Sequence, residues 1–159
     1  MNISEKRKLL STQLEEHLNS LDKAMETLFY SHAKCIRIGA KDYYDLEEQE
    51  SFEALASRFA RDSDILTQKV LKTFYILLQE DIKTFIDVSN FLEKLNIIEK
   101  ADDLLNIREL RNQIAHEYVE TELPSLFAEI LNHVPILSLI LKNVKLFIEE
   151  KRLINSARS

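Results

Sequence analysis

An arginine, an asparagine and a histidine lie close together in the segment Arg-Asn-Gln-Ile-Ala-His-Glu-Tyr at residues 111–118. A neutral imidazole such as that of His116 can take a proton from a ribose 2′-hydroxyl, and the Arg111 guanidinium can neutralise charge that grows on a phosphate. The Asn112 amide both donates and accepts hydrogen bonds, so it can orient either group. These side chains therefore suit phosphodiester cleavage without a metal, with the Tyr118 hydroxyl as an addition at the rim.

The segment is expected near the end of a helix whose apolar side includes an unexpected cation. At about 100° per residue, Arg111 falls inside the arc formed by the apolar residues of the helix, which are Leu104, Ile107, Leu110, Ile114, Ala115 and Tyr118. Asn112 and His116 are predicted to stack on one flank, close to Arg108, because they are four residues apart. Arg111 and His116 would lie about 140° apart with an axial offset of about 7.5 Å, so one helix does not aim both at a single point. Spacing alone is weak evidence for catalysis.

The rest of the chain predicts the elements that position this segment. Apolar residues recur at gaps of three, four and seven along most of its length, which indicates amphipathic helices. Five helices are expected: from a cap at Ser4 to Gly39, from about Glu50 to Gln79, from Phe85 to near Ile98, from about Leu104 through the motif, and from Pro124 to Ile148, with Pro135 kinking or dividing the last. Residues 41–49 are predicted to be a polar connection that contains Tyr43 and Tyr44.

Composition supports an all-α fold. The chain has 159 residues, one Gly and two Pro, so it has few residues that break helices or form tight hairpin turns. A chain of this length can bury a substantial core as one domain. We therefore expect an antiparallel bundle of about five helices in a single domain over residues 1–159, with a flexible polar tail at 152–159.

Charge and cysteine content limit the cellular setting. A formal net charge of −6 argues against a broad basic surface that wraps nucleic acid, so an RNA role needs a small local positive site. The lone Cys35 and an amino end unlike a signal peptide favour a reducing cytoplasm. The longest apolar run, Val134–Leu141, is far shorter than the roughly 20 residues that cross a bilayer, so no membrane span is expected.

Other side chains that could do chemistry have simpler roles. His17, His32 and His133 lack the Cys or carboxylate spacing of a metal site, so packing or surface roles are expected, and neither metal nor cofactor is predicted. Arg58 and Arg61, one turn apart in the second helix, are predicted to lie on a solvated face. A single glycine cannot build a phosphate-binding glycine loop or a nucleophile elbow, which disfavours kinases, dinucleotide enzymes and serine hydrolases.

The wider string Ile-Arg-Glu-Leu-Arg-Asn-Gln-Ile-Ala-His-Glu-Tyr at residues 107–118 closely resembles the signature of the HEPN superfamily. Its members typically have an Arg, often followed by Asn, then a His after four to six residues, with a Tyr two positions later in one major branch. Here Arg111, Asn112, His116 and Tyr118 match that pattern. The plan also resembles HEPN domains, which are all-helical and carry the motif on a late helix before a final long one.

The resemblance implies a metal-independent endoribonuclease, often the toxin of a bacterial toxin–antitoxin pair, in which Arg111 and His116 form the catalytic pair. Such proteins usually form homodimers in which the motif helices of two chains meet in one cleft. That arrangement would gather the differently directed side chains around one phosphate. It would also supply a local positive site through two copies of Arg111 and of Arg108.

The resemblance also names partners and a regulatory residue. The branch with this Tyr commonly pairs with a small nucleotidyltransferase antitoxin, which in some cases adenylylates the Tyr, and Tyr118 holds the matching position. An added nucleotide would obstruct RNA and cancel positive charge. The sequence does not identify the RNA substrate.

Two other classes of function stay open at this point. One is a noncatalytic nucleotide-binding or partner-binding subunit of a nucleotidyltransferase, and the other is a purely structural bundle. In a strict monomer, Arg111 would need an acid from its own chain, and the second helix is the expected source, although the sequence does not single out which acid.

Overall fold

The computed structural model describes residues 1–116 and 122–154, and within them the chain is all-helical. Five continuous helical segments follow one another: α1 (Ile3–Ile38), α2 (Leu46–Asp64) with its continuation through the π-helix η1 (Ile65–Val70) into α3 (Leu71–Leu77), α4 (Phe85–Lys94), α5 (Ala101–Ala115) and α6 (Leu123–Glu150). The predicted all-α bundle of about five helices is therefore confirmed.

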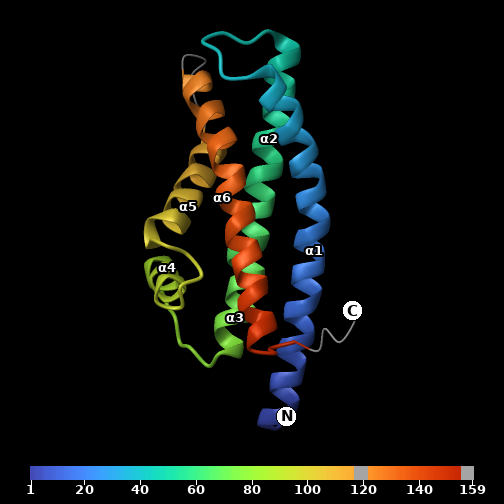
Figure 1. The fold of residues 1–159 in the computed structure, drawn as a ribbon, viewed down its shortest axis with the longest axis vertical. Helices are drawn as coiled ribbons and strands as arrows, with labels where there is room; N and C mark the ends of the chain where they lie inside the picture. Colours follow the sequence, from blue (N-terminus) through green and yellow to red (C-terminus); the bar gives the residue numbers. More distant parts are fainter. Residues whose placement is uncertain (117–121, 155–159) are drawn as a thin grey trace.

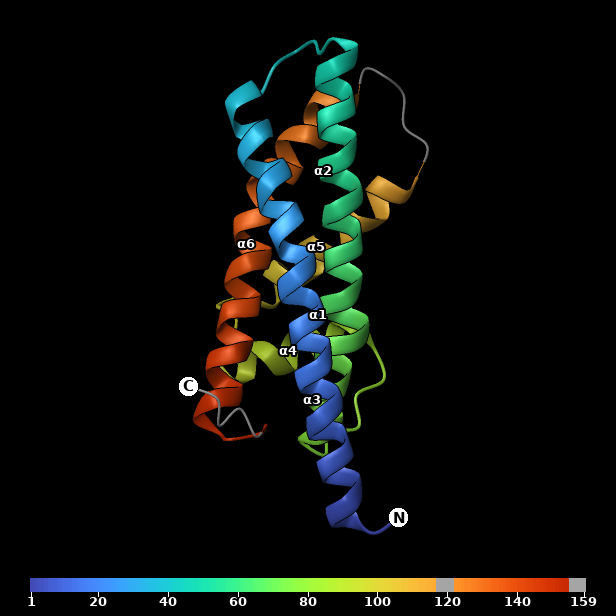
Figure 2. The ribbon, with the colours of Figure 1, turned by 90° about the vertical axis from the view of Figure 1, so that its right-hand side faces the viewer.

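The long helices form a bundle around one shared core. α1 runs in one direction, and α2 with α3 and α6 run in the other, so α1 is antiparallel to both of its long neighbours (Figure 1). Turning the molecule by 90° shows α1 between α6 on one side and α2 on the other (Figure 2). α5 packs against α2 and α6 and also contacts the short α4. The motif helix therefore closes the seam between α2 and α6.

Capping residues set several helix ends and correct the predicted boundaries. Asn2, not Ser4, caps α1, and it forms a reciprocal pair of hydrogen bonds with Glu5. Asp45 and Glu48 form the same capping box at the start of α2, so this helix begins at Leu46 instead of about Glu50. Gly39 ends α1 with a positive φ of 81°, as predicted, because glycine adopts this conformation without a steric penalty.

The later helices differ from the prediction mainly at their ends. α4 stops at Lys94, four residues before the predicted end, and Ile97 and Ile98 are nevertheless buried after it. Pro124 lies in the first turn of α6, as predicted. α6 continues through Pro135 to Glu150, so the predicted division at this proline is wrong.

The interhelical contact beside Pro135 explains how the helix continues. Proline has no backbone N–H, so the carbonyl of Leu131 loses its usual donor four residues later. The Nε2 atom of His32 in α1 lies 3.0 Å from that carbonyl oxygen and takes the place of the missing donor. His32 therefore has a packing role, and the proline is accommodated by a neighbouring helix.

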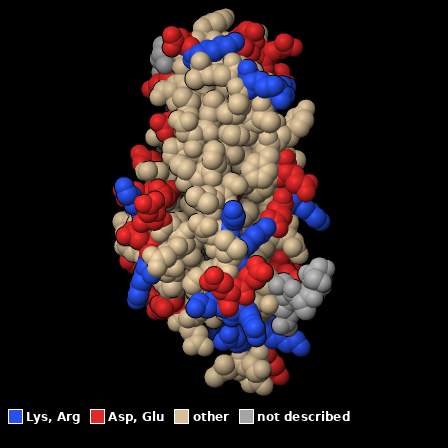
Figure 3. Space-filling model, viewed as in Figure 1, with Lys and Arg blue, Asp and Glu red and all other residues tan. Residues whose placement is uncertain are grey.

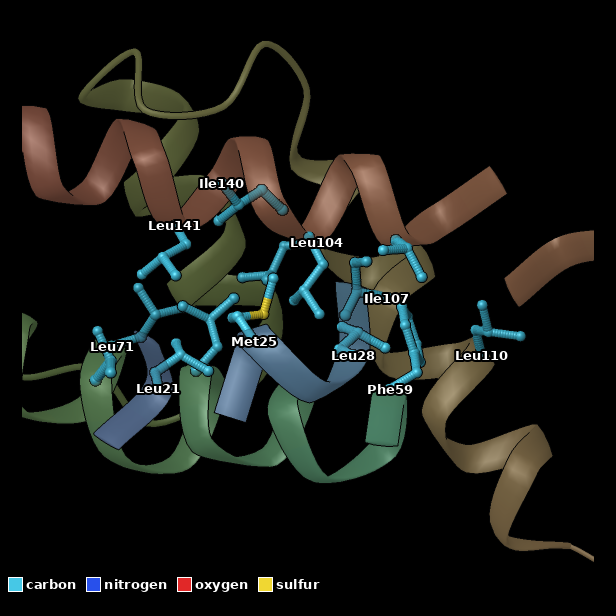
Figure 4. Packing of buried hydrophobic residues seen from close by; sticks show 14 of the residues in the cluster. Leu21, Met25, Leu28, Phe59, Leu71, Leu104, Ile107, Leu110, Ile140 and Leu141 are labelled. Atoms are coloured by element: carbon cyan, nitrogen blue, oxygen red, sulfur yellow. The ribbon is translucent and has the colours of Figure 1, made fainter. Parts of the chain in front are cut away.

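Apolar residues from every long helix meet in one cluster. Figure 4 shows side chains of α1, α2, α3, α5 and α6 pointing toward one another, among them Leu28, Phe59 and Ile107. Tyr44, which the sequence places in a polar connection, is buried and packs against Phe52 and Phe127. The expected polar loop is therefore partly a core element. Leu153, in the predicted flexible tail, is also buried, and its carbonyl accepts a hydrogen bond from Ser11.

The second helix changes its hydrogen-bonding pattern in the middle. Residues Ile65–Val70 form a π-helix, which the sequence did not predict. Immediately before it, Asp62 and Ser63 are buried, and neither the Asp62 Oδ2 nor the Ser63 Oγ has a partner among the described residues. Burial raises the pKa of Asp62, against a smaller opposing effect of its hydrogen bond with Arg61.

α6 contains an unusually apolar stretch. The helix is long enough to cross a membrane, and its most apolar stretch of 18 residues has a mean hydropathy of 1.5, with 44% of that stretch buried inside the fold. The expectation that no segment could span a membrane is therefore not confirmed by length and composition. A core helix of a globular domain gives the same signal, so the finding is weak evidence for a membrane.

Candidate functional site

Arg111 lies on the side of α5 that faces α2, inside the apolar arc where the sequence places it. Its guanidinium forms two parallel bonds with the Asp64 carboxylate, from Nε to Oδ1 at 2.8 Å and from Nη2 to Oδ2 at 3.0 Å. The two side chains remain 31% and 33% exposed. Hydrogen bonding and the charge of Asp64 raise the pKa of Arg111, so the guanidinium stays cationic. The pair is thus fixed in geometry and still open to solvent.

The fork geometry leaves part of the guanidinium available. Arginine carries five N–H groups, and Asp64 takes one on Nε and one on Nη2. The other three N–H groups have no protein acceptor among residues 1–116 and 122–154. They can donate to an anion that approaches from solvent, and that anion would meet a cation whose charge Asp64 already balances in part.

His116 lies at the carboxyl end of the motif helix. α5 ends at Ala115, and His116 is its C-cap with an extended ψ of 153°, held by a 3.2 Å bond from its N–H to the carbonyl of Gln113. The ψ of His116 directs only the chain that follows it, so the stack of Asn112 and His116 on one flank and the angle of about 140° between Arg111 and His116 stay predictions. Both Asn112 and His116 are exposed.

Two further features set the electrostatics at this end of α5. Arg108, one turn before Arg111, lies with its guanidinium carbon 4.5 Å from the centre of the Phe85 ring in α4, a cation–π contact. The last carbonyl groups of a helix carry partial negative charge. The carboxyl end of α5 therefore repels a phosphate beside His116. The positive charges of Arg108 and Arg111 offset that repulsion.

Arg58 and Arg61 have partners of a different kind. Arg58 donates to the carbonyl of Thr27 and to the Ser31 hydroxyl, while Arg61 donates to the carbonyl of Ala24. The prediction of a solvated face holds in part, because Arg61 is exposed and Arg58 is half-buried, but both arginines also tie α2 to α1. They contribute to packing and do not join the Arg111 group.

Asp64 is the site residue that the sequence did not identify. The second helix was the expected source of an acid for Arg111, and Asp64 is the last residue of α2. The helix has several acids, and the one opposite Arg111 depends on the register between α2 and α5. No periodic pattern within α2 alone reports this register, because it depends on how the two helices pack against each other.

Some expected features can be placed only in part. Tyr118, the predicted rim and modification residue, lies outside the described residues. Within the described ranges, no group of three or more His, Cys, Asp or Glu side chains is arranged to hold a metal ion. Cys35 is buried, and burial raises its pKa to about 11, which suits a packing role.

No protein-family model matches the chain, and no curated protein or solved structure is significantly similar to it.

Proposed function

We propose that the carboxyl end of α5 is the RNA-cleaving site of a metal-independent endoribonuclease, the toxin of a HEPN–nucleotidyltransferase pair. The observation that carries the proposal is the Arg111 guanidinium, which is oriented by Asp64 and lies one and a half turns before the exposed His116. Three of its N–H groups have no acceptor within the described ranges 1–116 and 122–154. A preorganised cation close to an accessible imidazole is what transesterification of RNA requires.

The proposed reaction uses side chains of the chain itself. His116 takes the proton of a 2′-hydroxyl, the 2′-oxygen bonds to phosphorus, and the bond from phosphorus to the 5′-oxygen breaks. Arg111 stabilises the added negative charge on the phosphate oxygens, and Asn112 holds the imidazole or the phosphate. The departing 5′-oxygen takes a proton from water, which leaves a 2′,3′-cyclic phosphate end.

Asp64 has a defined part in this proposal. It fixes the plane of the guanidinium before RNA binds, and it also competes with phosphate for the same cation. Asp64→Asn should therefore tighten binding of a non-cleavable 2′-O-methyl RNA and add about one to the slope of log affinity against log salt. Unchanged affinity and slope would mean that Arg111 does not contact phosphate.

Cleavage of total RNA in the presence of a chelator tests the activity directly. His116→Ala should lower the rate by about 100-fold or more, which is the usual contribution of a general base. His17→Ala, in the distant first half of α1, is the matched control and should cleave as the wild type does. The proposal fails if the wild type does not cleave, or if His116→Ala cleaves with the same pattern and rate.

The two-chain cleft that the resemblance implies can be tested with the same assay. Arg111→Ala chains mixed with His116→Ala chains regain activity if one site takes its residues from both chains, and stay inactive if each chain carries its own site. Adenylylation of Tyr118 by a nucleotidyltransferase partner belongs to the same proposal, and Tyr118→Phe should escape that inhibition while it still cleaves RNA.

One observation favours a second function, a noncatalytic partner-binding subunit. The charge of Arg111 is already balanced by Asp64 within the chain, so the site holds less net positive charge than the motif alone suggests. Such a subunit would bind a nucleotidyltransferase with unchanged affinity after His116→Ala and would show no cleavage in the chelator assay.

A further inference from the structure

The outward side of α6 carries a regular stripe of residues that its own chain does not cover. Positions at alternating gaps of four and three share this side, the pattern of a coiled-coil seam. Leu139 is 55% exposed and Leu146 48%, which is unusual for large apolar side chains in the middle of a long helix. The stripe comprises Ala128, Asn132, Pro135, Leu139, Lys142 and Leu146.

The stripe lies in a broad surface that has few charges. In the view of Figure 1, where α6 is in front, an uncharged band occupies the upper middle of the molecule, and charged side chains lie along its sides and across the lower part of the face (Figure 3). α1 borders it with the exposed side chains of Phe29 and Ile36. A groove of about 340 Å³ between the two helices is lined by Phe29, Pro135 and Leu139. An uncovered apolar surface of this kind marks a contact site.

Side-chain size along the stripe identifies the occupant. The first half has short or compact side chains, Ala128, Asn132 and Pro135, and the second half has long ones, Leu139, Lys142 and Leu146. When the stripe is paired with an antiparallel copy of itself about a midpoint between Pro135 and Leu139, every long side chain meets a short one. The stripe is thus complementary to itself, the requirement for a two-fold symmetric contact.

The polar residues agree with the same pairing. Lys142 falls opposite the Asn132 of the other copy, whose amide oxygen can accept from the ammonium group. Glu129, one turn from Lys142 in this register, is exposed and adds an opposite charge beside the pair. Each polar contact occurs twice in a two-fold arrangement. The only stripe residue with a full charge is therefore matched in the antiparallel register.

We propose that a second copy of this chain packs on this face, with α6 against α6 in antiparallel orientation. The Leu139 side chain of each copy then enters the groove beside Phe29 of the other. This contact is separate from the Arg111 site, because Arg111 pairs with Asp64 of α2, whereas the groove lies between α6 and α1. The proposal therefore does not depend on RNA cleavage, and its tests measure mass.

Light scattering and sedimentation of the full chain test the contact. The wild type should be a dimer at micromolar concentration. Leu139→Arg should raise the dissociation constant of the dimer by about 100-fold or more, because the new guanidinium loses its water at the centre of the contact between the two α6 helices. Ile86→Arg is the matched control, since Ile86 in α4 is 59% exposed and lies outside the stripe. It should leave the dimer intact.

A charge exchange tests the antiparallel register. Asn132→Lys places two ammonium groups opposite each other and should dissociate the dimer, and Lys142→Glu in the same chain should restore it. A parallel pairing would not show this rescue. Circular dichroism of each variant confirms that the helices are retained, so dissociation is distinguished from unfolding.

Three results would overturn the proposal. A monomeric wild type shows that no second copy binds, and a dimer that survives Leu139→Arg shows that the copies meet elsewhere. The third is flotation of a monomeric wild type with vesicles of phosphatidylcholine and phosphatidylglycerol, abolished by Leu139→Arg, which assigns the same face to a membrane. Absence of flotation together with the charge rescue supports the proposed dimer.

Discussion

The two flanks of α6 differ although one continuous apolar helix supplies both. On one flank α2 and α5 cover the helix, and Phe127 stacks on Phe52 with ring centres 4.6 Å apart. On the other flank α1 leaves a groove and an exposed row that includes Leu139. The difference shows that α6 has more apolar surface than its own chain covers.

Truncating one side chain on each flank should give the largest contrast. Phe127→Ala removes a fully buried ring and should lower the free energy of unfolding by about 3–5 kcal/mol. Leu139→Ala should change it by less than about 0.5 kcal/mol in dilute protein, because the side chain is exposed. Urea denaturation at low concentration measures both. Similar losses for the two variants would mean that the flanks are equally packed within one chain.

Removing the hydrogen bond beside Pro135, on the open flank, should lower the free energy of unfolding by an intermediate amount. His32→Ala leaves the Leu131 carbonyl without a donor and should cost about 1–3 kcal/mol. Pro135→Ala restores a backbone N–H four residues after Leu131, so the cost of losing His32 should be smaller in that background. A double-mutant cycle in urea measures this coupling. Additive effects would show that His32 does not substitute for the missing donor.

The buried Asp62 carboxyl on the covered side of α2 should make the free energy of unfolding depend on pH. This is the smallest of the expected effects. Burial raises its pKa in the folded state, so the folded protein holds this proton more tightly than the unfolded chain. Stability should therefore fall as pH rises from about 4, the unfolded pKa, through the folded pKa. Asp62→Asn should lose this part of the pH dependence, and Asp81→Asn, at an exposed position, should keep it. The urea midpoints of each variant, measured over this pH range, check the prediction. If the wild type and Asp62→Asn lose stability equally with rising pH, Asp62 is not the cause of the pH dependence.

The sequence predicted helices better than contacts between helices. Periodic apolar residues located all five segments, and Gly39 and Pro124 marked an end and a start, because these signals act within one element. The start of α2 was missed because residues 41–49 are mostly polar and resemble a loop. The capping box of Asp45 and Glu48 nevertheless starts the helix at Leu46. Errors of this kind come from competing local signals.

The candidate site was predicted only where it depends on one helix. Arg111 lies in the apolar arc of α5, as its position in the periodicity indicated. Its partner Asp64 is 47 residues away in sequence, and the pairing depends on the register between α2 and α5, which the periodic pattern of one helix does not contain. His116, predicted near the end of the helix, is the C-cap of α5. Helix ends and interhelical registers therefore set the limit of prediction here.

The π-helix at Ile65–Val70 bears on how the chain tolerates changes in length. A turn closed by bonds to the fifth residue holds about one residue more than an α-helical turn, so this stretch behaves as an insertion already absorbed within a rod. A chain shortened by one residue there can rewind as an ordinary α-helix while Phe59 and Phe74 still face the core. The same shortening elsewhere in α2 would rotate one half of the helix against the other and turn apolar side chains outward.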